Sequence, residues 1–131
     1  MPRVWDLDSG TQVMVLSGHE QLCDAIAFSP DGSLLATGDQ GGKVKIWDAA
    51  SGQELLSFGS GGVIHNLAYS LDGARLAAAN EDGTLTVWDP TTGQETLSLP
   101  RMSGLYSVAF MPDGKRVVTA HQDGTSKIWD A

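Results

Sequence analysis

A Trp-Asp pair preceded by Val or Ile occurs four times in the chain, at residues 4–6, 46–48, 87–89 and 128–130. The four tryptophans are 42, 41 and 41 residues apart. Each interval also contains an Asp-Gly pair and a second glycine at matching places. Self-similarity at a fixed period of about 40 residues indicates a tandem array in which one structural unit is repeated. This period constrains the fold before any local pattern is considered.

The residue pattern within each repeat predicts four short strands and no helix. The first is a nearly continuous apolar run, typical of a strand buried on both faces. Asp-Gly then predicts a tight turn, because glycine adopts positive φ easily. A strand of small or β-branched residues follows, then a strand that ends at Trp-Asp, then a more polar strand typical of an outer edge. The predicted strands are 3–7, 12–16, 22–29, 34–37, 43–47, 54–58, 64–69, 75–79, 84–88, 95–99, 105–111, 116–120 and 125–129.

These motifs resemble the WD repeat, which forms one blade of a β-propeller. The resemblance is carried by Gly18-His19, by the hairpin Ser29-Pro30-Asp31-Gly32 and by the repeated Trp-Asp, and it covers essentially the whole chain. It implies an all-β fold of four-stranded antiparallel meanders in a partial propeller. The implied units are a partial blade of third and fourth strands (1–17), two full repeats (18–58 and 59–99) and a repeat without its outer strand (100–131).

The resemblance also implies a buried hydrogen-bond network in each blade. It joins the Gly-His histidine, a Ser or Thr eight residues before the Trp, an Asp six before it, and the Trp. By these offsets no repeat has the complete set, so we expect apolar packing to dominate and stability to be modest. The positions hold His19, Asp39, Gly41 and Trp47, then Ser60, Asn80, Asp82 and Trp88, then Arg101, His121, Asp123 and Trp129. The expected structural residues are Trp5, His19, Trp47, Asp82, Trp88, Asp123 and Trp129.

Composition favours a soluble, cytoplasmic protein that binds neither membranes nor nucleic acid. The chain has no signal-peptide pattern and no apolar stretch near the length of a membrane span. Its single cysteine, Cys23, cannot form an internal disulfide and is expected to be a small buried hydrophobe. The net charge of −8 repels phosphate, and the eight Lys and Arg residues are scattered.

The sequence offers no pattern for catalysis or for a cofactor. Metal ligands would have to converge at fixed spacing, but the three histidines occupy three different blade positions. No nucleophile elbow or phosphate loop is present, and the glycines at 59, 61 and 62 lie between blades without a following helix. We therefore expect no catalytic residue, no metal and no cofactor.

The resemblance implies that a protein or peptide partner binds at one rim of the propeller, where the loops before the first strands meet the second turns. Among the candidates, Val63, Met102 and Tyr106 are the least expected on an inert surface and are the first choices for a contact. The alternative is that these are ordinary loops without a partner. The candidate partner-binding residues are Glu20, Gln21, Gln40, Val63, Glu81, Met102, Ser103, Tyr106 and Gln122.

The predicted strands make about three blades, an arc whose end faces are open to water. Leaving ~400 Å² of apolar face exposed forgoes on the order of 10 kcal/mol. We therefore expect completion either by a longer array or by head-to-tail association, as a dimer of six blades or a trimer of nine. The sequence thus predicts a non-catalytic, self-associating interaction scaffold. The alternative is a regulatory propeller segment of a larger enzyme, such as a bacterial-type kinase or a nucleotide-switch protein.

Overall fold

A computed structural model describes residues 1–59 and 61–131, and these residues form thirteen strands and no helix. The strand number and order match the sequence prediction, with bounds that differ by a few residues at most. The strands are β1 (Arg3–Trp5), β2 (Gln12–Val15), β3 (Cys23–Phe28), β4 (Leu34–Asp39), β5 (Lys43–Asp48), β6 (Glu54–Gly59), β7 (Ile64–Tyr69), β8 (Leu76–Asn80), β9 (Leu85–Trp88), β10 (Glu95–Leu99), β11 (Leu105–Phe110), β12 (Arg116–His121) and β13 (Ser126–Asp130).

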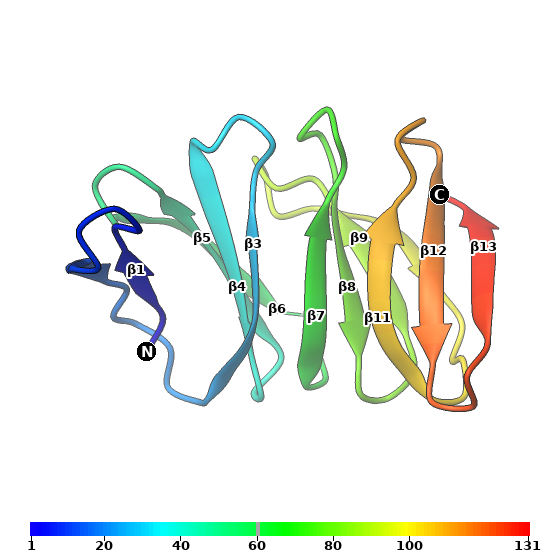
Figure 1. The fold of residues 1–131 in the computed structure, drawn as a ribbon. Helices are drawn as coiled ribbons and strands as arrows, with labels where there is room; N and C mark the ends of the chain where they lie inside the picture. The colour runs from blue at the N-terminus through cyan, green and yellow to red at the C-terminus, as the bar shows by residue number, and fades with distance from the viewer. Residues whose placement is uncertain (60) are drawn as a thin grey trace.

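The strands form four antiparallel sheets that stand side by side in an open arc (Figure 1). Two sheets have four strands, β3 to β6 and β7 to β10, while β1 and β2 form a two-stranded sheet and β11 to β13 a three-stranded one. The Asp-Gly hairpins after β3, β7 and β11 lie along the upper edge in Figure 1, and the second glycine turns lie along the lower edge. The prediction of all-β, four-stranded meanders in a partial propeller is confirmed.

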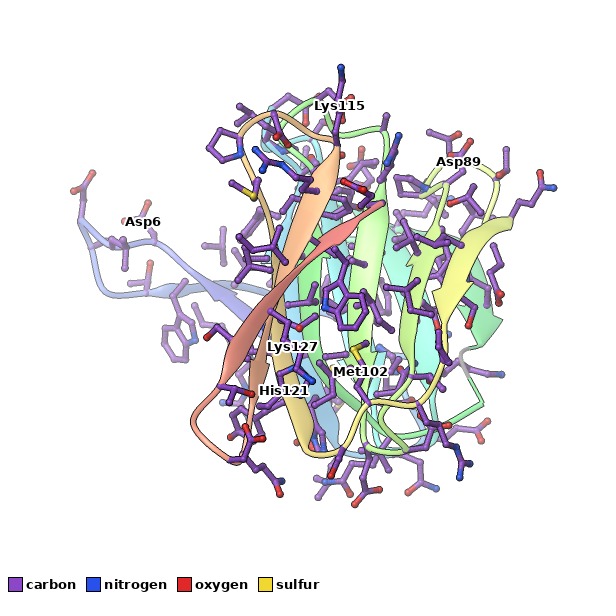
Figure 2. All side chains as sticks on the ribbon, turned by 90° about the vertical axis from the view of Figure 1, so that its right-hand side faces the viewer. Asp6, Asp89, Met102, Lys115, His121 and Lys127 are labelled. Carbon is purple, nitrogen blue, oxygen red and sulfur yellow. The ribbon has the colours of Figure 1, made fainter. Side chains whose placement is uncertain are left out.

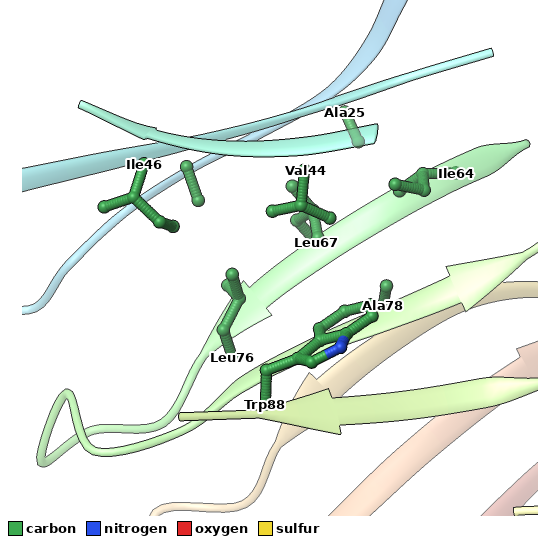
Figure 3. Packing of buried hydrophobic residues seen from close by; sticks show 9 residues of the cluster. Ala25, Val44, Ile46, Ile64, Leu67, Leu76, Ala78 and Trp88 are labelled. Carbon is green, nitrogen blue, oxygen red and sulfur yellow. The ribbon is translucent and has the colours of Figure 1, made fainter. Parts of the chain in front are cut away.

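The core lies between adjacent sheets. Ala25, Val44 and Ile46 of one sheet pack against Leu67 and the indole of Trp88 in the next (Figure 3). Trp47 and Trp88 are each only 1% exposed. Small residues make the close packing of second strands possible, since a Cβ at Gly38 would lie 2.6 Å from a methyl group of Ile64.

Trp5 differs from the other tryptophans. It was expected to be a structural residue of the same kind, but 52% of it is exposed. Each of the other tryptophans faces the preceding sheet, as Trp47 does when it packs against Leu16 and Leu35. Within the part of the chain that the structure describes, no sheet precedes β1, so Trp5 has nothing to pack against.

The first strands are buried on both faces only where a full neighbouring sheet covers them. Leu67 of β7 and Val108 of β11 are 4% and 3% exposed, but Ile26 at the matching place in β3 is 53% exposed. The prediction that all three first strands are buried on both faces is therefore wrong for β11, whose Ala109 is exposed on the side that no described sheet covers, and for β3. The reason is that the two-stranded sheet of β1 and β2 lacks the inner strands that would cover it.

The hydrogen-bond network is complete in the first full repeat, which corrects the expectation that no repeat has the full set. His19 bonds Asp39 through Nδ1 and Thr37 through Nε2, each at 2.6 Å, and Trp47 Nε1 donates to Thr37 Oγ1 at 2.8 Å. The hydroxyl residue therefore lies ten residues before the Trp and the aspartate eight before it. Gly41, six before the Trp, only donates its N–H to Asp39.

The other two repeats replace members of this network. In the second repeat Ala78 stands in place of Thr37. Asn80 Nδ2 donates to Thr84 and Thr86, while its buried Oδ1 has no partner among the described residues. The expected member Ser60 lies outside the described residues. In the third repeat Trp129 Nε1 donates to Thr119 Oγ1, which pairs with His121 Nε2.

Asp82 and Asp123 do not belong to these networks. Both are exposed in the second turns, where each accepts hydrogen bonds from the N–H and the hydroxyl of a threonine two residues later, Thr84 or Thr125. The expectation that these aspartates join the buried cluster was wrong because the assumed offset from the Trp was two residues too short.

Candidate partner-binding surface

The candidate residues lie along the lower edge of the arc in Figure 1, and we call this edge the rim. Backbone hydrogen bonds tie each second turn to the segment before the first strand. The N–H groups of Gln40, Glu81 and Gln122 donate to the carbonyl oxygens of Leu22, Val63 and Gly104 at 2.8 to 2.9 Å. The rim therefore consists of short loops fastened to each other within every blade, a rigid support for a binding surface.

Most of the candidate residues are available to a partner. Val63 is half-buried, and the exposed members are Glu20, Gln21, Gln40, Glu81, Ser103, Tyr106 and Gln122. Tyr106 is 61% exposed, the largest value for an apolar or aromatic candidate.

Met102 is the exception, and the expectation of an exposed contact there was wrong. Its side chain is 8% exposed and packs with Leu85, Leu105 and Val108 in the core between the last two sheets. Its backbone N–H donates to the carbonyl of Gly83 at 2.8 Å, which holds this loop close to the second turn of the preceding blade. Met102 therefore fastens two blades together and presents no side chain at the rim.

Each first strand contains a β-bulge at the rim. The pairing register shifts between Cys23 and Ala25, between Ile64 and Asn66, and between Leu105 and Ser107. The extra residue of each bulge is Asp24, His65 or Tyr106, and these stand 41 residues apart. Bulges redirect a side chain out of the regular pleat and are frequent at functional sites. Asp24 and His65 were missed by the sequence analysis, although aligning the repeats on Tyr106 would have found them.

The three bulge residues make contacts along the rim. The rings of His65 and Tyr106 lie 5.8 Å apart with an angle of 30° between their planes. Asp24 accepts a hydrogen bond from the side-chain amide of Gln40 at 2.7 Å. The rim thus offers an aromatic pair on the second and third blades and a carboxylate on the first.

Fixed negative charge surrounds this aromatic pair. Hydrogen bonds from the Thr84 hydroxyl and N–H lower the pKa of Asp82, and those from Thr125 lower the pKa of Asp123 in the same way. Burial opposes ionisation of Asp39, but the N–H of Lys43 and the His19 imidazole outweigh it and lower the pKa of Asp39. The guanidinium of Arg101 lies 3.8 Å from Asp82. A partner that meets this rim therefore meets the ionised carboxylates of Asp82 and Asp123, whereas Asp39 is buried and paired with His19.

The described residues give little support for a metal site, a membrane-spanning helix or a reactive cysteine. They contain no cluster of three or more His, Cys, Asp or Glu side chains suited to a metal ion. None of their secondary structure is a helix of membrane-spanning length and hydrophobicity. Cys23 is only partly buried, and burial raises the pKa of its thiol, which donates to the Gly38 carbonyl at 3.3 Å. At neutral pH this thiol is therefore held in its protonated, less reactive form.

The family of the chain follows from its match to the model for the WD domain, G-beta repeat. The matched segments are residues 10–48, 52–89 and 94–130, which together make up most of the chain. The chain therefore belongs to the WD40-repeat family, and its sheets are propeller blades.

Several curated proteins are similar to parts of the chain. The periodic tryptophan protein 2 homolog of Dictyostelium discoideum is 42% identical over 55 residues, which are 42% of this chain and 6% of that protein. The small ribosomal subunit protein RACK1y of Oryza sativa subsp. japonica is 38% identical over 65 residues, 50% of this chain and 19% of that protein. Human coronin-7 is 41% identical over 59 residues, 45% of this chain and 6% of that protein.

Solved structures show the same fold. The WD40 repeats of RRP9 superpose with a TM-score of 0.83 and the structure of U3-55K with 0.84, each at 20% identity and over 90% of this chain. The chain covers 38% of the length of each of these two structures, and 6 to 19% of the three curated relatives above. At 20% identity the likeness concerns the fold alone.

Proposed function

We propose that the chain is a non-catalytic protein-interaction module of the WD40 type, which binds a protein or peptide at its rim. The observation that carries the proposal is the row of bulges, which holds Asp24, His65 and Tyr106 on a rigid edge. An exposed aromatic pair on a preorganised support is typical of a contact that dominates binding energy. The relatives support an interaction role by family, while their own partners and assemblies remain properties of those proteins.

The rim can be tested with peptides selected from a random display library against the unmodified chain. Tyr106→Ser should weaken binding of the selected peptides at least about tenfold, because a mostly exposed aromatic contact is lost. The melting temperature should stay unchanged. Gln53→Ser and Gln94→Ser, on the outer wall of the blades, are the matched controls and should have no effect. Peptides that bind Tyr106→Ser normally but lose binding to the outer-wall variants would contradict the proposal.

We further propose that the open arc is completed by other blades, in the first place those of a second copy. Residues at equivalent places of the repeats differ in exposure between the two end sheets and the interior of the chain. Ile26 is 53% exposed, whereas Leu67 is 4%. At the other end Ile128 is 59% exposed, whereas Ile46 and Val87 are each 1%. The two open faces thus carry apolar side chains at places that are buried at the junctions inside the chain, although Ser126 of the last sheet stands where Val44 and Leu85 stand in the other two.

Head-to-tail stacking would repeat those internal junctions. Strands β11 and β12 would then cover β3 of the next copy, just as the β3 to β6 sheet covers β7, and β2 of that copy would supply the outer strand of the blade. One third strand, either β1 or β13, would be surplus. Two copies would close about six blades and three copies about nine. Further repeats of a longer polypeptide would present the same face, so they are the alternative way to complete the arc.

A further inference from the structure

The edge opposite the rim carries an apolar groove of about 310 Å³, which we call the hairpin groove. It crosses three blades at the ends of their first strands, the upper edge in Figure 1. Its lining residues are Phe28, Pro30, Tyr69, Leu71, Phe110, Met111 and Pro112. Figure 2 shows the separation of the two edges, with Lys115 of the third hairpin at the top and His121 near the bottom.

The groove repeats one pattern in every blade. The aromatic rings of Phe28, Tyr69 and Phe110 stand 41 residues apart, and an apolar turn residue follows each one two positions later. Leu71 is 66% exposed and Phe28 is 55% exposed. Single exposed hydrophobic side chains are common, but a continuous row contributed by three blades marks a binding surface.

The groove also contains an unused hydrogen-bond donor. The hydroxyl of Tyr69 is buried and has no hydrogen-bond partner among the described residues. Burial, and secondarily the charge of Asp31, raise the pKa of Tyr69 to about 12, so the hydroxyl keeps its proton at neutral pH. A buried donor without a partner is unfavourable, so a peptide that displaces the side chains covering this hydroxyl and supplies an acceptor would gain affinity there. The negative charge of Asp31 favours a neutral acceptor, such as a peptide carbonyl, over a carboxylate.

The charge around the groove narrows the choice of ligand further. Aspartates outnumber basic residues two to one at this edge, and two of the cations are engaged. Arg116 binds Asp113 at 2.8 Å, and Arg75 donates to the carbonyl of Ala131. Hydrogen bonds from neighbouring groups of the turns lower the pKa of Asp31, Asp48, Asp72, Asp89 and Asp113, and the Ser29 hydroxyl lowers that of Asp31 to about 2. The charged residues at this edge are Asp31, Asp48, Asp72, Asp89, Asp113, Asp130, Arg75, Lys115 and Arg116.

We propose that the hairpin groove binds an extended peptide segment of another protein, with proline or leucine side chains on the three rings and with Lys or Arg on both flanks. Aromatic rows with a hydroxyl donor suit extended, proline-containing chains, whose rings pack on aromatic faces while their carbonyls stay free to accept hydrogen bonds. The flanking cations match the ionised aspartates of the hairpins. The same carboxylates disfavour nucleic acid and anionic membranes. This site lies away from the rim, so it does not depend on the function proposed there; at one end it adjoins an open end face, because Phe28 stands on the same side of β3 as Ile26.

The test uses a synthetic probe peptide with three Pro-Leu pairs between two lysines at each end. Titration of the ¹⁵N-labelled chain should produce saturable NMR shifts confined to residues 28–33, 69–74 and 110–115. A peptide with glutamates in place of the lysines, and one with serines in place of proline and leucine, should bind at least about fivefold more weakly. Shifts that centre on the rim, equal binding of all three peptides, or no binding would each overturn the proposal.

Two variants separate binding from folding. Leu71→Ser should weaken binding of the probe peptide at least about fivefold. The matched control is Leu55→Ser, at a residue 50% exposed on outer strand β6, which should leave the affinity unchanged. Tyr69→Phe should leave the melting temperature equal or higher, since Phe already occupies the matching places at 28 and 110. The same change should weaken binding of the peptide about fivefold. Unchanged peptide affinity in Leu71→Ser would contradict the proposal that the groove is the binding site. Unchanged affinity in Tyr69→Phe would contradict the hydrogen bond from Tyr69 to a peptide carbonyl.

Discussion

Single side chains decide how each blade is held together, and the three repeats use different ones at the same places. The first repeat joins His19, Asp39, Thr37 and Trp47 through hydrogen bonds between side chains. The third substitutes His121 for the aspartate and bonds it to the Ser103 carbonyl at 3.0 Å. The second keeps only a partial network, with the buried Oδ1 of Asn80 unpaired. Since a buried polar cluster stabilises only when its members are satisfied, the first repeat gains most from its network.

The prediction at this scale is that Thr37→Val destabilises the protein by roughly 2–4 kcal/mol. The hydroxyl of Thr37 serves both the imidazole of His19 and the indole N–H of Trp47, and losing it leaves two buried groups unpaired. Urea denaturation measures the change. Ser98→Ala, at an exposed side chain on outer strand β10, is the control and should cost less than about 0.5 kcal/mol. Equal midpoints for the two variants would show that the network contributes nothing to stability.

At the scale of elements, the turns repeat a single device. Aspartates in the turns accept hydrogen bonds from neighbouring N–H and hydroxyl groups, as Asp31 does from Ser29 and Ser33 and Asp48 from Ser51. These bonds favour the ionised carboxylate and lower its pKa, for Asp31 from 3.8 to about 2. The turns that set the strand order are therefore also the acid-sensitive parts of the blades.

The prediction from these turns is a loss of stability in acid. A carboxylate whose pKa is lower in the folded chain stabilises it fully above the unfolded value near 4, and this contribution disappears as the pH falls through the folded value. The urea midpoint should therefore fall steadily between about pH 4 and pH 2. Asp31→Asn should make that decline shallower because it removes one such titration. A midpoint that stays constant over this range would contradict the role of the turns.

At the scale of the whole molecule, the arc has two different open faces. Ile26 lies on one and Ile128 on the other, and both match buried positions inside the chain. In the proposed assembly, contact between copies would be head-to-tail and would close only when the ring is complete, since the two faces differ. That assembly would depend on the two end sheets, while the rim and the hairpin groove lie on the edges.

The prediction for the molecule is that the 13.8 kDa chain sediments at micromolar concentration as a dimer or trimer. Ile26→Glu and Ile128→Glu should each give monomers, because a buried unpaired charge would break one face. An equimolar mixture should recover a one-to-one dimer, since one intact face of each kind remains. Leu55→Glu is the control and should assemble normally. A stable monomer of the unmodified chain, or a mixture that stays monomeric, would contradict head-to-tail closure.

The period, the strand order and the turn positions were determined by the sequence alone. They depend on local conformation, such as the positive φ of Gly32, Gly73 and Gly114 in the hairpins, and each signal is repeated three times. The rim candidates followed from the same repeat, with Tyr106 and Gln122 exposed as expected.

Only the tertiary structure decided which side chains meet across a sheet or between blades. It placed Thr37 in the network, buried Met102 between two sheets, and brought Asp24, His65 and Tyr106 to the rim through bulges. It also left Ile26 exposed where Leu67 is buried, although the two occupy the same place in the repeat. The physical reason is that burial depends on neighbours about one whole repeat away, and equal local sequence does not ensure an equal neighbour.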